Sequence, residues 1–242
     1  MIHEFSRTEM LIGTDGLERL SRSCVAVFGV GGVGSHAIEA LGRSGVGKLA
    51  LVDNDTVALT NINRQSIALH STLGRFKTQV MKEKLTDINL NARVMTLEQF
   101  VLPENLEAVF EEIYRELGPV DYILDAIDTV TAKLALVEYA GLRGIPIISS
   151  MGTGNKLHPE LFSISDISKT SVCPLCRVMR KELKNRGIHH LTVCWSPEKP
   201  LVPSVTEEDT KNRRATPGSI SFVPPVAGLM IAGEIVRRLS EA

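Results

Sequence analysis

The sequence predicts an α/β protein built on a doubly wound, mainly parallel sheet with a C-terminal elaboration. Two observations carry this prediction. Short apolar runs alternate with helical patterns from residue 24 to residue 150, and this alternation is typical of a parallel sheet covered by helices. A glycine-rich loop of the pattern G-x-G-x-x-G follows the first apolar run directly, which is where doubly wound sheets bind phosphate groups.

Five apolar runs have the length and composition of buried strands. They cover residues 24–28, 48–53, 92–98, 121–128 and 145–150. Helical patterns separate them, over residues 34–45, 74–89, 103–117 and 131–144. Strand and helix therefore alternate in chain order, as the fold class requires.

Spacing and end residues support individual helices. In the first helix, Ala37, Ile38 and Leu41 share one face, and Gly45 suits its C-terminal end. The second helix places a larger apolar set roughly on one side: Phe76, Val80, Leu85 and Ile88. Pro103 suits the first turn of the helix over 103–117.

The tail after residue 150 follows a different pattern. Residues 160–168 indicate one more strand, whereas 169–217 are charged, rich in proline and poorly periodic. The apolar segment 220–236 contains two prolines and a glutamate, so we expect a buried helix against the sheet or a partner, with no membrane insertion. We expect one domain over 1–242, with a core at 24–150 and an extension at 151–242.

Composition is that of an ordinary globular protein, with 43% hydrophobic and 23% charged residues. The net charge of −1 excludes a global field for nucleic acid, so any such binding needs a local patch. The N-terminal residues lack the pattern of a signal peptide, and four scattered cysteines do not indicate a secreted disulfide scaffold. We expect a cytoplasmic enzyme.

Ligands of doubly wound sheets bind beyond the carboxyl ends of the strands, where the strand order reverses. In the usual order the first and fourth strands are neighbours there, so the loop with Gly29, Gly31, Gly32 and Gly34 should face the turn that ends at Asp128. Asp53 ends the second strand, 19 residues after Gly34. This is the position of a ribose-binding acid, and a turn cap is the alternative role.

Polar residues after the second strand favour a triphosphate over a dinucleotide. Arg64 and Lys77 supply cations that suit the charge developing on a leaving pyrophosphate, although single cations are usually solvated. Asp128 suits a Mg²⁺ ligand or a helix N-cap. The other residues that we expect to bind nucleotide are polar and lie between the second strand and Lys77: Asp55, Asn61, Asn63 and Gln65.

The segments GVGGVGS, VDNDTV, TNINRQ, GRFK and LDAID occur in this order and together resemble the ThiF/MoeB/HesA adenylating enzymes, relatives of the ubiquitin-activating enzymes. The resemblance covers roughly residues 5–155. It implies a Rossmann-like ATP-binding fold, ATP, Mg²⁺ and activation of a carboxylate as an acyl-adenylate. It also implies a homodimer in which Arg7 reaches the partner's site. The alternative is a solvated Arg7 at the start of a helix.

Family members that activate a sulfur-carrier protein typically hold zinc with two C-x-x-C pairs. This chain has one pair, Cys173 and Cys176, with a lone Cys194 and with His189 or His190 as further candidates. Because the second pair is absent, we favour reduced cysteines over a zinc site.

The tail segments 166–188, 193–200 and 219–236 resemble instead the branch that dehydrates threonylcarbamoyladenosine in tRNA. In that branch ATP activates a carboxylate on the nucleoside, and an internal nitrogen closes a ring. Basic residues at helical spacing agree with an RNA substrate: Arg177, Arg180, Lys181 and Lys184, with Arg186 following. Lys211, Arg213 and Arg214 form a second basic cluster. A solvated helix is the alternative reading of the first set.

Three hypotheses follow. The first is an ATP-dependent tRNA-modifying cyclase. The second is an adenylyltransferase for a ubiquitin-like sulfur carrier, which shares the nucleotide site and would add sulfur-transfer accessory proteins as partners. The third is a dinucleotide-dependent oxidoreductase or redox sensor, which would give Arg64, Gln65 and Lys77 no function.

Overall fold

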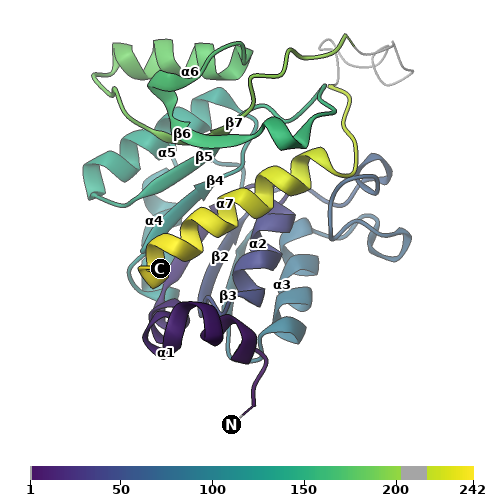
Figure 1. Cartoon of the computed structure of the whole chain (residues 1–242), viewed down its shortest axis with the longest axis vertical. Coiled ribbons are helices and arrows are strands. Elements are labelled where there is room, and N and C mark those ends of the chain that lie inside the picture. The colour runs from purple at the N-terminus through teal and green to yellow at the C-terminus, as the bar shows by residue number, and fades with distance from the viewer. Residues whose placement is uncertain (1, 203–216) are drawn as a thin grey trace.

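A computed structural model describes residues 2–202 and 217–242. Its centre is a seven-stranded sheet with the order β3-β2-β1-β4-β5-β7-β6 (Figure 1). All neighbours pair in parallel except β6 and β7, which are antiparallel. The strands are β1 Cys24–Phe28, β2 Lys48–Val52, β3 Arg93–Leu97, β4 Tyr122–Asp125, β5 Ile147–Ser150, β6 Ser163–Asp166 and β7 Thr192–Trp195. The predicted fold class is confirmed.

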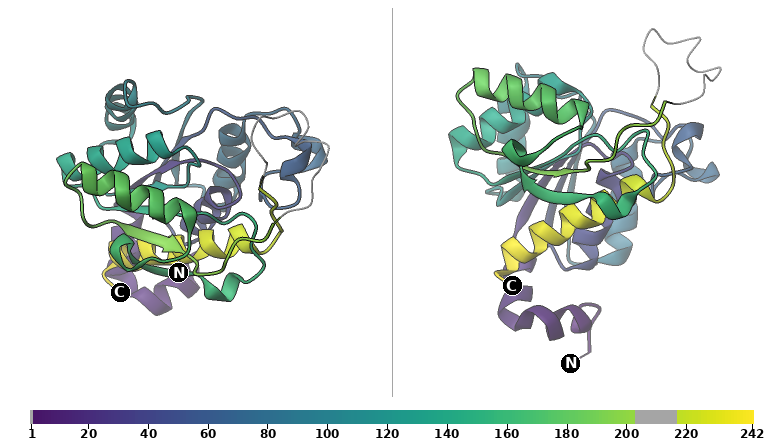
Figure 2. Two further views of the ribbon diagram at one scale, coloured as in Figure 1. Left: turned by 90° about the horizontal axis from the view of Figure 1, so that it is seen from above. Right: turned by 45° about the horizontal axis from the view of Figure 1, so that its top comes forward.

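Helices cover both faces of the sheet (Figures 1 and 2). One buried cluster joins the sheet to α2, α3 and α7, and a second joins its other face to α4 and α5. A third cluster joins α5, α6 and β7. The helices are α1 Ser6–Arg22, α2 Gly34–Arg43, α3 Lys77–Ile88, α4 Leu106–Leu117, α5 Val130–Arg143, α6 Pro174–Asn185 and α7 Val223–Ser240.

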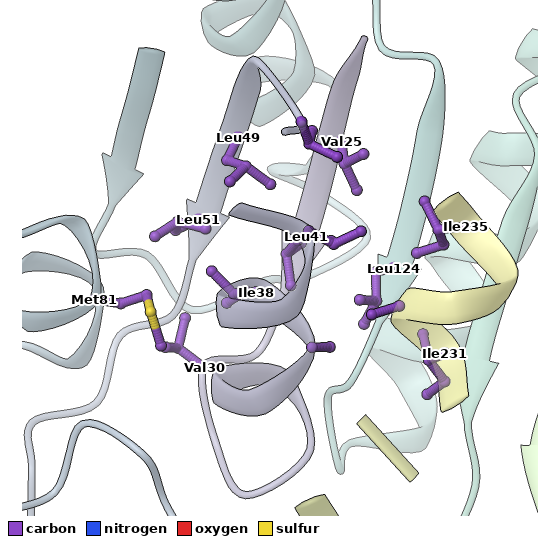
Figure 3. Close-up of a cluster of buried hydrophobic side chains, with 14 of the residues drawn as sticks. Val25, Val30, Ile38, Leu41, Leu49, Leu51, Met81, Leu124, Ile231 and Ile235 are labelled. Carbon is purple, nitrogen blue, oxygen red and sulfur yellow. The ribbon is translucent and has the colours of Figure 1, made fainter. Parts of the chain in front are cut away.

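The C-terminal helix α7 is part of the main core. Ile231 and Ile235 pack beside Ile38 and Leu41 of α2 on the sheet (Figure 3), and burial of each such side chain contributes about 1.5–3 kcal/mol. Gly228 allows the two helices to approach closely, because a Cβ there would lie 2.4 Å from the Val33 carbonyl oxygen. The expected buried helix is confirmed, and it packs on this chain's own sheet. In the described residues, we find no helix with the length and apolar character that crossing a membrane requires.

Several predicted boundaries are wrong for local reasons. The helix α3 begins at Lys77 because Phe76 pairs with Thr56 in an isolated bridge, and the Phe76 side chain is 45% exposed instead of buried. Pro103 precedes α4, which begins at Leu106. The fourth strand ends at Asp125, where the chain turns toward the glycine loop. The short strand β7 was not predicted.

Candidate functional site

A cavity of about 670 Å³ opens at the carboxyl ends of β1, β2, β4 and β5. This is the crevice that the strand order predicts, since β1 pairs with both β2 and β4. Small-molecule sites of roughly 300–1,000 Å³ are typical. The lining includes most of the predicted nucleotide-binding residues: Gly29, Gly31, Gly32, Asp53, Asp55, Asn61, Arg64, Gln65, Lys77 and Asp128.

The glycines of the loop after β1 have two different structural roles, close packing and an open backbone. Gly29 has φ +95°, and a Cβ there would lie 2.7 Å from the Ala126 carbonyl oxygen. A Cβ on Gly34 would lie 1.9 Å from the Gly29 oxygen, so both residues serve close packing. A Cβ placed on Gly31 would meet only Gln65 Nε2, at 4.0 Å, among the described residues other than its chain neighbours. Gly31 therefore leaves the backbone open to a ligand in the cavity.

Two carboxylates and a lysine link the glycine loop to α3. Asp53 accepts hydrogen bonds from the N–H of Val30 at 2.6 Å and of Asp55 at 2.8 Å. Burial raises the pKa of Asp53, while the nearby Lys77 opposes the rise. The Lys77 ammonium lies 2.7 Å from Asp55 Oδ2 and is only 7% exposed. Asp53 thus caps a turn and lines the cavity at once, and Lys77 is a buried cation at the cavity wall rather than a solvated one.

The segment after β2 brings the other predicted polar residues to the wall. Asn61 accepts a hydrogen bond from the Ala58 N–H at 3.1 Å. Arg64 Nη1 donates to the Thr60 carbonyl and to Asn63 Oδ1, at 2.8 and 2.9 Å. Asn63 lies outside the cavity lining in the described structure and donates to the Ser219 carbonyl at 2.9 Å. It therefore ties this segment to the start of the C-terminal region.

Gln65 provides an independent sign of a ligand. Its side chain is buried and lines the cavity, yet no donor among residues 2–202 and 217–242 reaches Oε1. A buried acceptor without a partner costs about 1–3 kcal/mol, so such atoms usually have a ligand or water. The Gln65 amide and the open backbone at Gly31 face the same cavity.

Asp128 lies in the turn after β4, exposed at the cavity wall. Its Oδ1 accepts a hydrogen bond from the Thr129 hydroxyl at 3.3 Å. The N-cap of α5 is Thr129, so the alternative role of Asp128 as a helix cap is wrong.

A buried ion pair behind this turn was missed in the sequence. Lys133 Nζ lies 3.0 Å from Asp125 Oδ2, and both side chains are fully buried. The same ammonium donates to the Ser150 carbonyl at 2.7 Å, and Asp125 Oδ1 accepts from the Ile127 N–H at 3.2 Å. The pair thus connects α5 and β5 to the turn that carries Asp128. A lysine at helical spacing gives no sequence signal that separates it from a surface lysine.

Arg7 lies at the far end of the molecule from the cavity. It is exposed near the start of α1, whereas the second half of the same helix lies beside the C-terminal end of α7, where Arg19 donates to the Ser240 carbonyl (Figure 2). The other end of α7 reaches the cavity at Pro224, and 16 residues of helix span roughly 24 Å. In a single chain Arg7 cannot reach the site, so its role in a partner's site stays a prediction, and its exposed position agrees equally with the alternative of a solvated arginine.

The predicted basic residues lie on α6 but do not all face solvent. Arg177, Lys181 and Lys184 are exposed. Arg180 is partly buried and donates to the Thr170 carbonyl at 2.9 Å, so it helps to hold the turn before α6. The second predicted cluster, Lys211, Arg213 and Arg214, lies outside the described residues.

The cysteines do not form the zinc set considered above. Cys194 lies on β7 with its sulfur 3.9 Å from the Ala227 carbonyl, whereas Cys173 and Cys176 lie at the start of α6. His190 pairs with Asp166 at 3.2 Å. No three residues of the metal-binding types gather at one point in the part of the chain that the structure describes.

The tail contributes cavity residues that sequence reasoning did not find. The loop after β5 supplies a stretch of small residues, and the segment before α7 supplies another. They line the cavity together with the polar residues described above: Gly152, Thr153, Gly154, Pro217, Gly218, Ser219 and Pro224. Small, uncharged residues carry no local signal, so only the fold shows their place.

A family model described as the ThiF family matches residues 5–242. This chain belongs to the ThiF family. A Bacillus subtilis (strain 168) relative named tRNA threonylcarbamoyladenosine dehydratase is 45% identical, over 99% of this chain and 95% of its own length. The protein of that name from Escherichia coli (strain K12) is 38% identical, over 75% of this chain and 65% of its own length.

A solved structure extends the likeness of this ThiF-family chain to three dimensions. The E. coli tRNA N6-threonylcarbamoyladenosine dehydratase TcdA, in complex with ATP, matches with a TM-score of 0.86 at 30% identity. The match covers 98% of this chain and 94% of the other. The predicted family and fold are both confirmed.

Proposed function

We propose that this protein is an ATP-dependent enzyme that activates the carboxylate of threonylcarbamoyladenosine in tRNA and promotes its cyclisation with loss of water. One observation carries the proposal. The cavity combines a phosphate-binding glycine loop, two cations, Arg64 and Lys77, and the carboxylate of Asp128. The relative named for this dehydration is similar over nearly the whole chain, tail included, which favours it over a sulfur-carrier substrate.

The residues of the cavity fit ATP. The backbone at Gly31 leaves room for phosphate oxygens, and the N-terminus of α2 directs N–H groups toward the same loop. Asp53, at the end of β2, suits the ribose hydroxyls, while the orphaned Gln65 Oε1 accepts a hydrogen bond from the bound ligand. Lys77 and Arg64 then stabilise negative charge on the departing pyrophosphate.

Asp128 suits a Mg²⁺ bound together with ATP. Mg²⁺ in nucleotide sites commonly takes one or two carboxylates, with phosphate oxygens and waters as its other ligands. Asp128 is an exposed carboxylate in the lining of the same cavity as the glycine loop, so it meets this need. The ion would neutralise phosphate charge when bound, and the Asp125–Lys133 pair would hold the turn that positions Asp128.

Activation suits a dehydration because AMP leaves more easily than hydroxide. A carboxylate oxygen attacks the α-phosphorus of ATP, and the bond to pyrophosphate breaks. An internal nitrogen of the nucleoside then attacks the activated carbonyl carbon, gives up its proton, and AMP leaves with the former carboxylate oxygen. The nucleophile belongs to the substrate, so holding it close supplies much of the rate and no enzyme thiol is needed.

We further propose a homodimer and a surface for tRNA. The exposed Arg7 on α1 can reach a nucleotide only in a second subunit, which supports a role in trans. The exposed Arg177, Lys181 and Lys184 of α6 offer phosphate contacts on the side of the molecule that the tail builds.

The test combines the protein with ATP, Mg²⁺ and tRNA that carries threonylcarbamoyladenosine. The nucleoside should lose the mass of one water molecule, with one AMP and one pyrophosphate released per cycle. An unchanged nucleoside, with pyrophosphate exchange that depends on a carrier protein, would favour the sulfur-carrier enzyme instead. Binding of NAD without binding of ATP would reject both.

A further inference from the structure

The proposed reaction makes no use of the C-P-L-C segment, whose two cysteines start α6. Cys173 is the N-cap of this twelve-residue helix, Pro174 opens it, and Cys176 lies one turn in. Both are free thiols and nearly fully buried, at 2% and 0% exposure. A C-x-x-C pair at a helix N-terminus is the arrangement that favours a thiolate on its first cysteine.

The surroundings of Cys173 select it as the thiolate. The Cys176 thiol is the main cause that lowers the pKa of Cys173 well below its usual value, and the backbone N–H groups of Cys176, Gly152 and Leu175 add to this effect against burial. The Cys173 thiolate and burial in turn raise the pKa of Cys176. The first cysteine of the pair is thus favoured as a thiolate nucleophile, and the second is favoured as a protonated thiol three residues later.

The backbone before the pair is strained. Val172 has φ +60°, a conformation that a β-branched residue rarely adopts. Such strain costs on the order of 1–3 kcal/mol and clusters at functional sites. Val172 lies directly before Cys173, so its backbone conformation affects how the N-cap cysteine is oriented at the start of α6.

Cys173 also lies directly behind the cavity wall. A Cβ placed on Gly152 would be 3.9 Å from Cys173 Sγ, and both Gly152 and Leu175 line the cavity. The Cys173 sulfur is therefore separated from the cavity only by the residues that line it. Only a small oxidant suits a sulfur with so little exposed surface.

We propose that Cys173 and Cys176 form a redox-active dithiol, which a small peroxide oxidises to a disulfide at the wall of the cavity. The Cys173 thiolate attacks one peroxide oxygen, the O–O bond breaks, and the leaving hydroxide takes a proton from solvent to become water. Cys173 is then a sulfenic acid. The Cys176 sulfur attacks the Cys173 sulfur, the S–O bond breaks, and the thiol proton leaves with that oxygen as a second water. Two electrons pass from the thiols to the peroxide.

The test uses hydrogen peroxide on the full chain, followed by alkylation of remaining thiols and peptide mass mapping. A Cys173–Cys176 disulfide should form and should reopen with dithiothreitol. The chain contains its own controls, since burial raises the pKa of Cys24 and of Cys194 to about 12. Cys173 should react roughly 50-fold faster than either, because its larger thiolate fraction outweighs its lower nucleophilicity.

Two variants separate the steps. Cys176→Ser should stop at a Cys173 sulfenic acid that dimedone traps, and Cys173→Ser should leave Cys176 reduced under the same treatment. Oxidation of Cys173 no faster than of Cys24 and Cys194, or peroxide treatment that leaves both thiols free, would overturn the proposal. This readout needs neither ATP nor tRNA, so it is independent of the proposed function.

Discussion

Replacing Lys133 by methionine should destabilise the protein far more than an ordinary loss of surface charge. The Lys133 ammonium and the Asp125 carboxylate are 3.0 Å apart with no exposed surface. The methionine fills most of the lysine volume, so the main loss is charge rather than packing. Asp125 would keep its hydrogen bond from the Ile127 N–H but would lose its cation, and the Ser150 carbonyl would lose its donor.

The expected magnitude follows from burial. Removing one partner of a buried ion pair leaves an uncompensated charge and costs about 3–5 kcal/mol. In a chain of 242 residues, each kcal/mol lowers Tm by roughly 2–4 °C. Lys133→Met should therefore lower Tm by about 6–20 °C.

Thermal unfolding of matched variants tests this estimate. Arg22→Met removes an exposed ion pair with Glu18 on α1, with side chains 77% and 54% exposed, and should cost less than about 1 kcal/mol. The double variant Asp125→Asn/Lys133→Met should be destabilised by less than the sum of its two single variants, because no unpaired charge remains. A Lys133→Met variant as stable as Arg22→Met would refute the reasoning.

Four other outcomes are expected. Lys77→Gln should lower ATP-dependent turnover roughly 10²–10³-fold, measured as pyrophosphate release, because it removes a cation from the developing charge. Gly31→Ala should keep the wild-type Tm and weaken ATP binding at least tenfold by calorimetry, since its Cβ enters the ligand space; unchanged affinity would place the phosphates elsewhere. Arg177→Glu with Lys181→Glu should weaken tRNA binding and flatten its salt dependence without changing ATP affinity, and an equal loss of both would make the patch structural. Hydrogen bonds from arginines one turn later lower the pKa of Glu234, so its stabilising effect is present above pH 4.5 and is lost as the pH falls; Glu234→Gln should lower Tm by roughly 1–4 °C at neutral pH and by less at pH 4.

Much of the fold and the polar part of the site follow from local patterns. The glycine loop, Asp53 and Lys77 occur at the ends of elements whose order in the sheet is governed by general rules, so their meeting at one crevice was predictable. The direction of each side chain was not. Phe76 lies in an exposed bridge rather than on the buried face of a helix, because pairing with Thr56 outweighs helical periodicity.

Residues that depend on long-range contacts escaped prediction. The strand β7 has four residues, and nothing near it in the sequence shows that it will fill the gap between β5 and β6. Lys133 has the spacing of an ordinary helix residue, and its burial depends on Asp125 and on the Ser150 carbonyl across the sheet. The part of the cavity wall that the tail forms consists mainly of glycine, proline, serine and threonine residues, which indicate loops without indicating where those loops lie.

Isotope transfer tests the central claim, adenylation of the substrate carboxylate, most directly. The tRNA would carry threonylcarbamoyladenosine labelled with ¹⁸O in its carboxylate, and one turnover with ATP would be analysed by mass spectrometry of the nucleotides. The account predicts one ¹⁸O atom in the phosphate of AMP, because the attacking carboxylate oxygen leaves with that phosphate. AMP without label, or label found in inorganic phosphate beside ADP, would contradict it.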